Sequence, residues 1–323
     1  MTEIERNRVI RILCPEPENY SQRGLAKAAE FRRLDAATLS QAEFEVRAPH
    51  YDAFMVRLRA RVSGELIGAC PRLRAIITPT TGLDHIDLET AHARRIAIFC
   101  LRGETEFLRT VTSTAEHTWA LLLCLVRHLI SARKTVEQDE WHQHRFRSCE
   151  LSGKTLGVLG LGRVGTMVAR YGLAFGMRVI AYDPYIETWP DGVTLVATLE
   201  EMLRGSKLLT VHVPLQRETV DLIGAREIGL LPSRAYLVNT SRGQIVNESA
   251  LLAALESGHL AGAAVDVLTD EMNVPGGNHQ MVAYLKTHDN LLITPHIGGA
   301  SEEAIEKADL FVLGKFDQWL RSI

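Results

Sequence analysis

The sequence has few of the features that mark specialised classes of protein. Aromatic residues make up only 6% of its 323 residues, and its five cysteines are scattered without any C-x-x-C pair. The longest strongly apolar run, Trp119–Val126, is followed directly by Arg127 and His128. A membrane-spanning helix needs about 20 apolar residues, so this run is too short to be one. The odd number of cysteines predicts reduced thiols in a reducing compartment rather than a disulfide framework.

The sequence also has no large excess of charge of either sign. It contains 36 lysines and arginines against 39 aspartates and glutamates, for a net charge of −3. This balance gives no support for a nucleic-acid or membrane surface. The opening residues, MTEIERNRVIRIL, are too charged for a signal peptide. We therefore expect a cytoplasmic protein with one large or two medium domains.

Short apolar runs alternate with longer amphipathic stretches along the chain, which is typical of α/β units. The runs are continuous rather than alternating with polar residues, as in strands buried on both faces of a parallel sheet. The expected strands are Val9–Cys14, Ala53–Arg57, Leu73–Thr78, Arg95–Cys100, Thr155–Gly160, Arg178–Asp183, Leu208–Val213, Ala235–Thr240, Gly262–Val267 and Asn290–Pro295. One long helix, from Ser113 to Gln138, separates two series of strands, and Ser113 and Glu116 form an S-x-x-E capping box at its start. The pattern predicts two Rossmann-like parallel-sheet α/β domains with a cleft between them.

The segment after residue 154 carries three glycines, Gly160, Gly162 and Gly165, at the G-x-G-x-x-G spacing. Alone, this spacing also suits a tight turn without a ligand, but here an apolar strand leads in and a helix leads out. The first glycine permits the turn, the second lets the backbone approach a pyrophosphate, and the third lets the helix pack against the strand. The context therefore predicts a dinucleotide-binding turn.

Asp183 stands at the end of the next expected strand. A carboxylate there can accept hydrogen bonds from the adenosine ribose hydroxyls, and it would repel a 2′-phosphate. The sequence therefore predicts NAD rather than NADP. The alternative role is that of a turn residue, because Asp-Pro is common in turns.

Three polar residues follow expected strands in the second half of the chain: Arg242, Glu271 and His296. Open α/β sheets place their sites at such strand ends. An arginine can bind a carboxylate and polarise the adjacent carbonyl group, and a histidine can exchange the hydroxyl proton. A glutamate can hold the imidazole. This set suits hydride transfer to or from a hydroxy acid, although each residue alone also suits a structural role.

Motifs along most of the chain from about Arg57 onward resemble those of one family. They are TTGLDHIDLETA, TAEHTWALLL, LSGKTLGVLGLGRVG, VHVPLQRET, LVNTSRGQIVNE, AAVDVLTDE and ITPHIGGAS. The chain resembles the D-2-hydroxyacid dehydrogenases, which include D-3-phosphoglycerate dehydrogenases and hydroxypyruvate reductases. The resemblance implies a flavodoxin-like substrate-binding domain from residues 1–112 and 297–323 and an NAD-binding Rossmann domain from 113–296. It also implies a homodimer with the long helix in the interface.

The resemblance assigns roles to individual residues. Arg242, Glu271 and His296 match the catalytic residues of the family. Thr81 and Gly82 match the loop that binds the substrate carboxylate through its backbone. The positions that line the cofactor, besides the three glycines and Asp183, are Arg163, Val164, His212, Pro214, Thr240, Asp266 and Gly298.

Residues that bear on substrate choice lie in two further segments. Arg57 and Arg59 match arginines that approach the substrate phosphate in some relatives, and the alternative is a solvated basic edge. The segment 100–113 is longer than in the family and lacks its Asn-Ala-Pro-Gly motif. We expect this loop, which carries Arg102 and Arg109, to set specificity for a substrate that is phosphorylated or dianionic. Met272 replaces the usual proline after the catalytic glutamate, and the segment after it is longer than usual.

Other functions find less support in the sequence. His142 and His144 have no Asp, Glu or Cys at ligand spacing, so no metal site is expected. Formate dehydrogenases carry glutamine where this chain has Glu271. Phosphite dehydrogenase keeps the same three catalytic residues, and NAD-sensing corepressors share the fold and the triad without relying on turnover. A phosphite dehydrogenase and an NAD sensor both stay open as alternatives. The sequence does not identify which 2-hydroxy acid would be the substrate.

Overall fold

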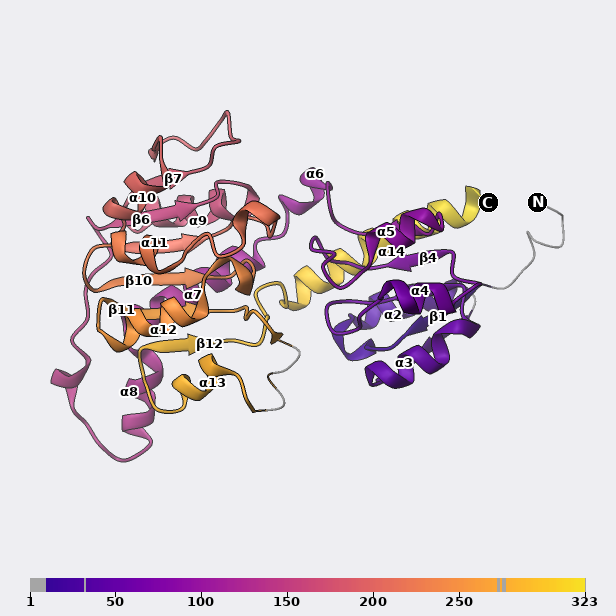
Figure 1. Ribbon diagram of the computed structural model, residues 1–323, viewed down its shortest axis with the longest axis horizontal. Helices are drawn as coiled ribbons and strands as arrows, with labels where there is room; N and C mark the ends of the chain where they lie inside the picture. The colour runs from indigo at the N-terminus through magenta and orange to yellow at the C-terminus, as the bar shows by residue number, and fades with distance from the viewer. Residues whose placement is uncertain (1–9, 32, 272–273, 275–276, 323) are drawn as a thin grey trace. The chain divides into compact units, whose positions relative to one another are not determined.

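The computed structural model describes residues 10–31, 33–271, 274 and 277–322. The chain forms two compact units, one made of Met1–Thr110 with Ala300–Ile323 and the other of Val111–Gly299. Figure 1 shows both units with most of their helices and strands labelled. The units divide after residues 110 and 299, whereas the sequence places the boundaries after 112 and 296.

The first unit contains a parallel sheet with the strand order β2-β1-β3-β4-β5 within the described residues. Successive residues of β3 point into different cores, since Phe54 packs in one cluster of buried side chains while Ala53 and Met55 pack in the other. The sheet is therefore covered on both faces. Its strands are β1 Arg11–Cys14, β2 Arg33–Ala36, β3 Ala53–Met55, β4 Ala75–Ile77 and β5 Ala97–Phe99; its helices are α2 Gln22–Glu30, α3 Gln41–Arg47, α4 Gly64–Ala69, α5 Leu88–Ala93, α6 Thr105–Leu108 and α14 Glu302–Ser322.

The second unit contains a parallel sheet with the order β12-β11-β10-β9-β6-β7-β8 among the described residues. Figure 1 shows β7, β6, β10, β11 and β12 in this sequence across the sheet. Leu237 and Val238 of β10 again point into opposite cores, one shared with α10–α13 and the other with α7 and α9. The strands are β6 Thr155–Leu159, β7 Arg178–Tyr182, β8 Val193–Leu195, β9 Leu208–Val211, β10 Ala235–Asn239, β11 Leu260–Val265 and β12 Leu291–Ile293; the helices are α7 Ser113–Val126, α8 Leu129–Val136, α9 Arg163–Ala174, α10 Leu199–Gly205, α11 Ala225–Leu230, α12 Glu248–Glu256 and α13 Gln280–Leu285.

The direction of the chain reverses across the sheet between β6 and β9, which are hydrogen-bonded neighbours. Connections on one side of this point lead to β7 and β8, and those on the other lead to β10, β11 and β12. Open α/β sheets bind ligands outside the carboxyl ends of the strands at such a switch point. The fold therefore places the expected cofactor site where β6 gives way to the glycine turn.

The prediction of two parallel-sheet α/β units is confirmed. Each expected strand is present with shorter bounds, except the one expected at Gly262–Val267, which is equally long but begins two residues earlier, at Leu260. Two edge strands, β2 and β8, were not predicted, because their short and partly exposed segments lack a continuous apolar run. The prediction of a single long helix from Ser113 to Gln138 was wrong. This segment breaks into α7 and α8 at His128, whose φ of +53° is left-handed. Within the described residues, no helix is both long and apolar enough to cross a bilayer.

The predicted capping box at the start of the long helix was also wrong. Thr112, not Ser113, precedes α7, and the Thr112 hydroxyl donates to Glu116 at 2.5 Å. The Ser113 hydroxyl instead donates to the carbonyl oxygen of Gly298 at 2.8 Å. A tertiary contact has therefore taken the side chain that the local pattern assigns to a cap.

Candidate active site

Three glycines shape the turn between β6 and α9. Gly160 has a φ of +86°, a conformation that residues with a side chain rarely adopt. A Cβ on Gly165 would lie 2.0 Å from the carbonyl oxygen of Gly160, so the helix can approach the turn only without a side chain there. A Cβ on Gly162, in contrast, would meet no atom of the described residues within 4 Å. The turn thus keeps space open at the N-terminus of α9, where a pyrophosphate fits.

Asp183 follows β7 and lies next to this turn. Its Oδ2 accepts a hydrogen bond from the backbone N–H of Leu161 at 2.9 Å, and its Oδ1 accepts one from Tyr185 at 3.0 Å. The second bond is that of an Asx-type turn, the alternative considered from the sequence. The first bond holds the glycine turn itself. A carboxylate has about four acceptor sites, so both bonds leave capacity for ribose hydroxyls.

Four other expected cofactor residues lie near the carboxyl ends of β6 and β9. The Arg163 guanidinium donates to the carbonyl oxygen of Val111 at 2.8 Å, and burial lowers the pKa of this arginine. Val164, also in α9, is half-buried, whereas Pro214 is exposed. Burial lowers the pKa of His212 to about 3, and its covered Nε2 bonds to nothing in the described part of the chain. His212 is therefore a neutral imidazole at physiological pH.

His296 and Glu271 are brought together from the segments that follow β12 and β11. The Nδ1 atom of His296 lies 2.8 Å from Oε2 of Glu271. An ionised carboxylate only accepts hydrogen bonds, so Nδ1 carries the proton of this bond, and Nε2 is left to exchange a proton. Nε2 makes no hydrogen bond to any residue in the described ranges. Met272, which the sequence analysis noted in place of the usual proline, lies outside the described residues.

The backbone around His296 is unusual and is held by Asp266. His296 has a φ of +54°, and its N–H donates to the carbonyl oxygen of Asp266 at 2.9 Å. The Asp266 carboxylate accepts the N–H groups of Ile297 at 2.9 Å and Gly298 at 2.7 Å, and the Thr294 hydroxyl at 2.5 Å. Burial alone would raise the pKa of Asp266, but these donors and a neighbouring imidazole leave it lowered. An ionised Asp266 thus fixes the chain on both sides of the histidine.

Arg242 lies in a turn that packs against the segment leading to Glu271. A Cβ on the next residue, Gly243, would lie 2.0 Å from the carbonyl carbon of Leu268. The N–H of Leu268 in turn donates to Oε1 of Glu271 at 3.2 Å. The Arg242 guanidinium donates to the carbonyl oxygen of Ser241 at 2.7 Å. The structure thus places the backbone of the arginine turn against the segment that carries the glutamate.

The sequence analysis missed the contribution of α7 to this site. His117 directs its Nε2 toward the Asp266 carboxylate at 3.2 Å. The hydroxyl of Thr118 hydrogen-bonds with that of Thr240 at 2.8 Å, and Ser113 contacts Gly298 as described above. The available signal was a cluster of polar residues within an otherwise strongly apolar helix.

The two arginines expected to approach a substrate phosphate lie in the first unit. Arg57 pairs with Asp309 of α14 at 2.6 Å, with side chains 15% and 0% exposed, so it is not part of a solvated edge. Burial raises the pKa of Asp309, while the adjacent arginine opposes this shift. Arg59 pairs with Glu18 at 2.8 Å and donates to two backbone carbonyl groups. Both arginines therefore have partners within the unit, and their role toward a substrate stays a prediction.

The loop between β5 and α7 contains the short helix α6. The two arginines of this loop, Arg102 and Arg109, have different surroundings. Thr81 and Gly82 follow β4, and Nε of Arg102 lies 3.5 Å from the carbonyl oxygen of Thr81. Arg109 instead pairs with Glu106 at 2.8 Å, with both side chains exposed. Of the two, Arg102 lies beside the expected carboxylate-binding loop.

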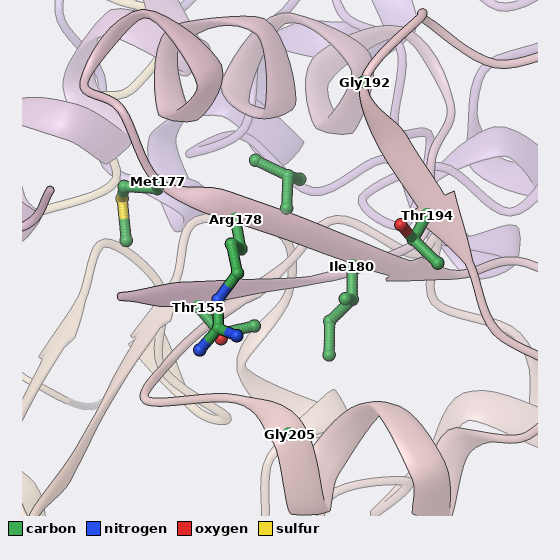
Figure 2. Close-up of a pocket in the computed structure, with 8 residues that line it drawn as sticks. Thr155, Met177, Arg178, Ile180, Gly192, Thr194 and Gly205 are labelled. Carbon is green, nitrogen blue, oxygen red and sulfur yellow. The ribbon is translucent and has the colours of Figure 1, made fainter. Parts of the chain in front are cut away.

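A cavity of about 490 Å³ in the second unit lies away from these residues (Figure 2). Its lining includes Thr155, Arg178 and Thr194, which stand in the first or second positions of β6, β7 and β8. Because the strands are parallel, their amino ends lie at the edge of the sheet opposite to the carboxyl ends that carry the glycine turn and Asp183. The cavity is therefore not the cofactor site.

Comparison with known proteins assigns the chain to a family. Residues 119–298 match the model of the D-isomer specific 2-hydroxyacid dehydrogenase, NAD binding domain. The chain belongs to this family, and the cofactor of this domain is NAD.

Individual relatives extend the match beyond this domain. The chain is 33% identical over 317 residues to D-3-phosphoglycerate dehydrogenase of Methanocaldococcus jannaschii, covering 97% of this chain but 58% of that enzyme. It is 38% identical over 266 residues to glyoxylate reductase of Aeropyrum pernix, covering 80% of this chain and 76% of the reductase. The chain thus spans about half the length of the phosphoglycerate dehydrogenases that it matches.

Solved structures match both units. The crystal structure of D-lactate dehydrogenase from Aquifex aeolicus, complexed with NAD and lactic acid, superposes with a TM-score of 0.83 at 29% identity. The match covers 97% of this chain and 96% of that one.

Proposed function

We propose that the protein is an NAD-dependent oxidoreductase that acts on the CH–OH group of a small 2-hydroxy acid, or in reverse on the corresponding 2-oxo acid. The pairing of His296 with Glu271 at 2.8 Å, in the unit that carries the open glycine turn, is the observation that carries this proposal. The names of the relatives support the class, because they are reductases and dehydrogenases of phosphoglycerate, glyoxylate and lactate.

The side chains of the site divide the chemistry among them. When bound at the glycine turn, NAD would supply the hydride chemistry, as acceptor in oxidation and donor in reduction. Arg242 binds the substrate carboxylate and polarises the carbonyl group, since a guanidinium matches a carboxylate with two parallel hydrogen bonds. His296 takes the hydroxyl proton at Nε2 during oxidation and returns it during reduction. Glu271 holds Nδ1 and stabilises the imidazolium that forms.

The substrate that this proposal favours carries a second anionic group, either a phosphate or a carboxylate. Arg102 supports it, because the guanidinium lies beside Thr81 in the expected carboxylate-binding loop. Arg57 and Arg59 are further candidates, although a substrate would compete there with Asp309 and Glu18. The first unit, with these residues, is the proposed substrate-binding domain.

We also propose a homodimer in the cytoplasm. Four large apolar side chains on or near α8 are exposed: Leu129, Ile130, Val136 and Trp141, at 50%, 41%, 52% and 83%. A second copy of the chain would bury such a surface. Light scattering with size-exclusion chromatography tests this, and a monomer at micromolar concentration would contradict it.

The activity is tested with a panel of 2-oxo acids and NADH, together with His296→Asn. Asparagine suits the left-handed backbone at this position. We expect the variant to fold and to bind NADH. Its kcat should fall about 10²–10⁴-fold, which is the usual contribution of an acid–base group. His142→Asn, at an exposed histidine of the same unit, is the control.

Near-normal turnover by His296→Asn would remove this histidine from the mechanism. NADH binding by the wild type without turnover on any acid would favour a sensor over an enzyme. If the protein oxidised phosphite with NAD⁺, its substrate would be phosphite and not a 2-hydroxy acid.

A further inference from the structure

Three consecutive peptide groups, from Val267 to Asp270, connect the arginine turn to the catalytic glutamate. The peptide between Leu268 and Thr269 packs on Gly243, where a Cβ would lie 2.3 Å from the Thr269 nitrogen. The carbonyl oxygen of Thr269 accepts a hydrogen bond from Nε2 of Gln244 at 3.1 Å. The N–H of Leu268 donates to the Glu271 carboxylate. This N–H belongs to the adjoining Val267–Leu268 peptide, so a displacement of the Leu268–Thr269 peptide would disturb the bond to the glutamate that orients the histidine.

A second glutamate, on a different element from Glu271, holds the Leu268–Thr269 peptide in place. Glu248 is the first residue of α12, and its Oε1 accepts the N–H of Thr269 at 2.8 Å. Its Oε2 accepts a hydrogen bond from Nε2 of Gln280 at 3.3 Å and lies 3.6 Å from Nε2 of His279. The Glu248 side chain is only 10% exposed. One carboxylate thus joins the start of α12, the start of α13 and the loop that carries Glu271.

Glu248 is not needed as the cap of its own helix. Asn247 precedes α12, and its side chain accepts the N–H of Ala250 at 2.9 Å, which is the usual N-cap bond. The oxygens of Glu248 are directed to other segments instead. A favourable interaction with the helix dipole would need only the negative charge, not the reach of this side chain.

We propose that Glu248 is a positioning residue for the hydride-transfer reaction. It fixes the Leu268–Thr269 peptide and, through the adjoining N–H of Leu268, the Glu271 carboxylate against His296. This inference rests on the proposed function. A misplacement of about 1 Å near reacting groups can cost on the order of a hundredfold in rate, so we expect the loss of this one positioning hydrogen bond to lower kcat strongly.

Three substitutions separate positioning from a role in charge or stability. Glu248→Gln keeps the length and an oxygen acceptor for the Thr269 N–H but removes the charge. Glu248→Asp keeps the charge at the start of α12 but is one methylene too short to make the bond. Glu248→Ala removes both. Glu201→Ala is the matched control, because Glu201 also stands in the first turn of a helix of the same unit and accepts a backbone N–H, from Ala197.

We expect the aspartate and alanine variants to lose about ten- to a hundredfold in kcat, with the KM for NADH unchanged. The glutamine variant should retain most of the wild-type kcat, and the Glu201 control all of it. A role through charge predicts the reverse order, with aspartate active and glutamine impaired. That order, or equal kcat values in Glu248→Asp and the wild type, would overturn the proposal.

A second measurement does not depend on turnover. In protein labelled with ¹⁵N-histidine, the Nδ1 signal of His296 is assigned by its loss in His296→Asn. We expect this signal to shift in Glu248→Asp but not in Glu248→Gln, because only the former releases the Glu271 loop. An unchanged signal in Glu248→Asp would overturn the positioning role. A shifted signal in a protein that turns over no acid would retain the link to His296 and reject the proposed function instead.

Discussion

Gly162 and Gly165 belong to the same turn, yet alanine should affect them in opposite ways. At Gly165 the added Cβ would lie 2.0 Å from the Gly160 oxygen, whereas ordinary contacts begin at 3.4 Å, so these atoms must separate by 1.4 Å. Overpacking of this kind costs about 1–3 kcal/mol. At about 2–4 °C per kcal/mol for a unit of this size, Gly165→Ala should lower Tm by roughly 2–12 °C.

At Gly162 the added Cβ meets no described atom within 4 Å, and the φ of −66° suits alanine. The remaining cost, replacing glycine by alanine at an N-cap, is about 1 kcal/mol or less, or at most about 4 °C in Tm. The methyl group would instead occupy the space where the pyrophosphate fits. The same overpacking scale then applies to the NADH complex and predicts roughly a 5- to 150-fold loss of affinity.

Thermal unfolding followed by circular dichroism and titration of NADH fluorescence measure the two effects separately. We expect Gly162→Ala to bind NADH poorly while unfolding close to the wild-type temperature. Wild-type NADH affinity in this variant would show that the cofactor does not pass over Gly162. A wild-type Tm in Gly165→Ala would refute the packing argument.

Three further changes test other parts of the structure. Asp183→Ser should relax the preference for NADH over NADPH, because it removes the charge that repels a 2′-phosphate; equal use of both cofactors by the wild type would contradict this. Arg102→Ala should raise the KM for a dianionic 2-oxo acid about ten- to a hundredfold, the value of a charged hydrogen bond, while leaving glyoxylate unaffected. Arg109→Ala, which removes an arginine paired with Glu106, is the comparison, and wild-type KM values in both variants would leave the loop without a role in specificity. Because the folded-state pKa of Asp266 is lowered, its stabilisation is present above the ordinary aspartate pKa and lost as pH falls through the lowered value. Asp266→Asn should therefore lower Tm at neutral pH by an amount that shrinks in acid, and a pH-independent difference would contradict the assignment.

The parts of the fold that the sequence predicts are those that local chemistry determines. The strands buried on both faces are continuous apolar runs, and the glycine turn needs particular residues at fixed spacing. The same local reasoning finds His296 and Glu271, because each follows a strand in a parallel sheet. Their pairing also depends on which strands are neighbours, and β11 and β12 are adjacent in the sheet.

The parts that the sequence does not predict depend on contacts between distant segments. The pairing of Arg57 with Asp309 joins residues 252 positions apart, so no local pattern reveals it. Ser113 has the spacing of a capping residue, but a carbonyl group near the other end of its unit takes the hydroxyl. The bond from Thr269 to Glu248 likewise needs the three-dimensional arrangement of α12 and the loop after β11.

The left-handed backbone of His296 sets stability against activity at one position. A residue with a side chain held in this conformation costs on the order of 1–3 kcal/mol, a cost that glycine would avoid. Selection for heat resistance alone would therefore enrich glycine at position 296 and discard the proposed proton-transferring group. Thermostable variants of this protein should be sought elsewhere in the chain, with this histidine kept fixed throughout the search.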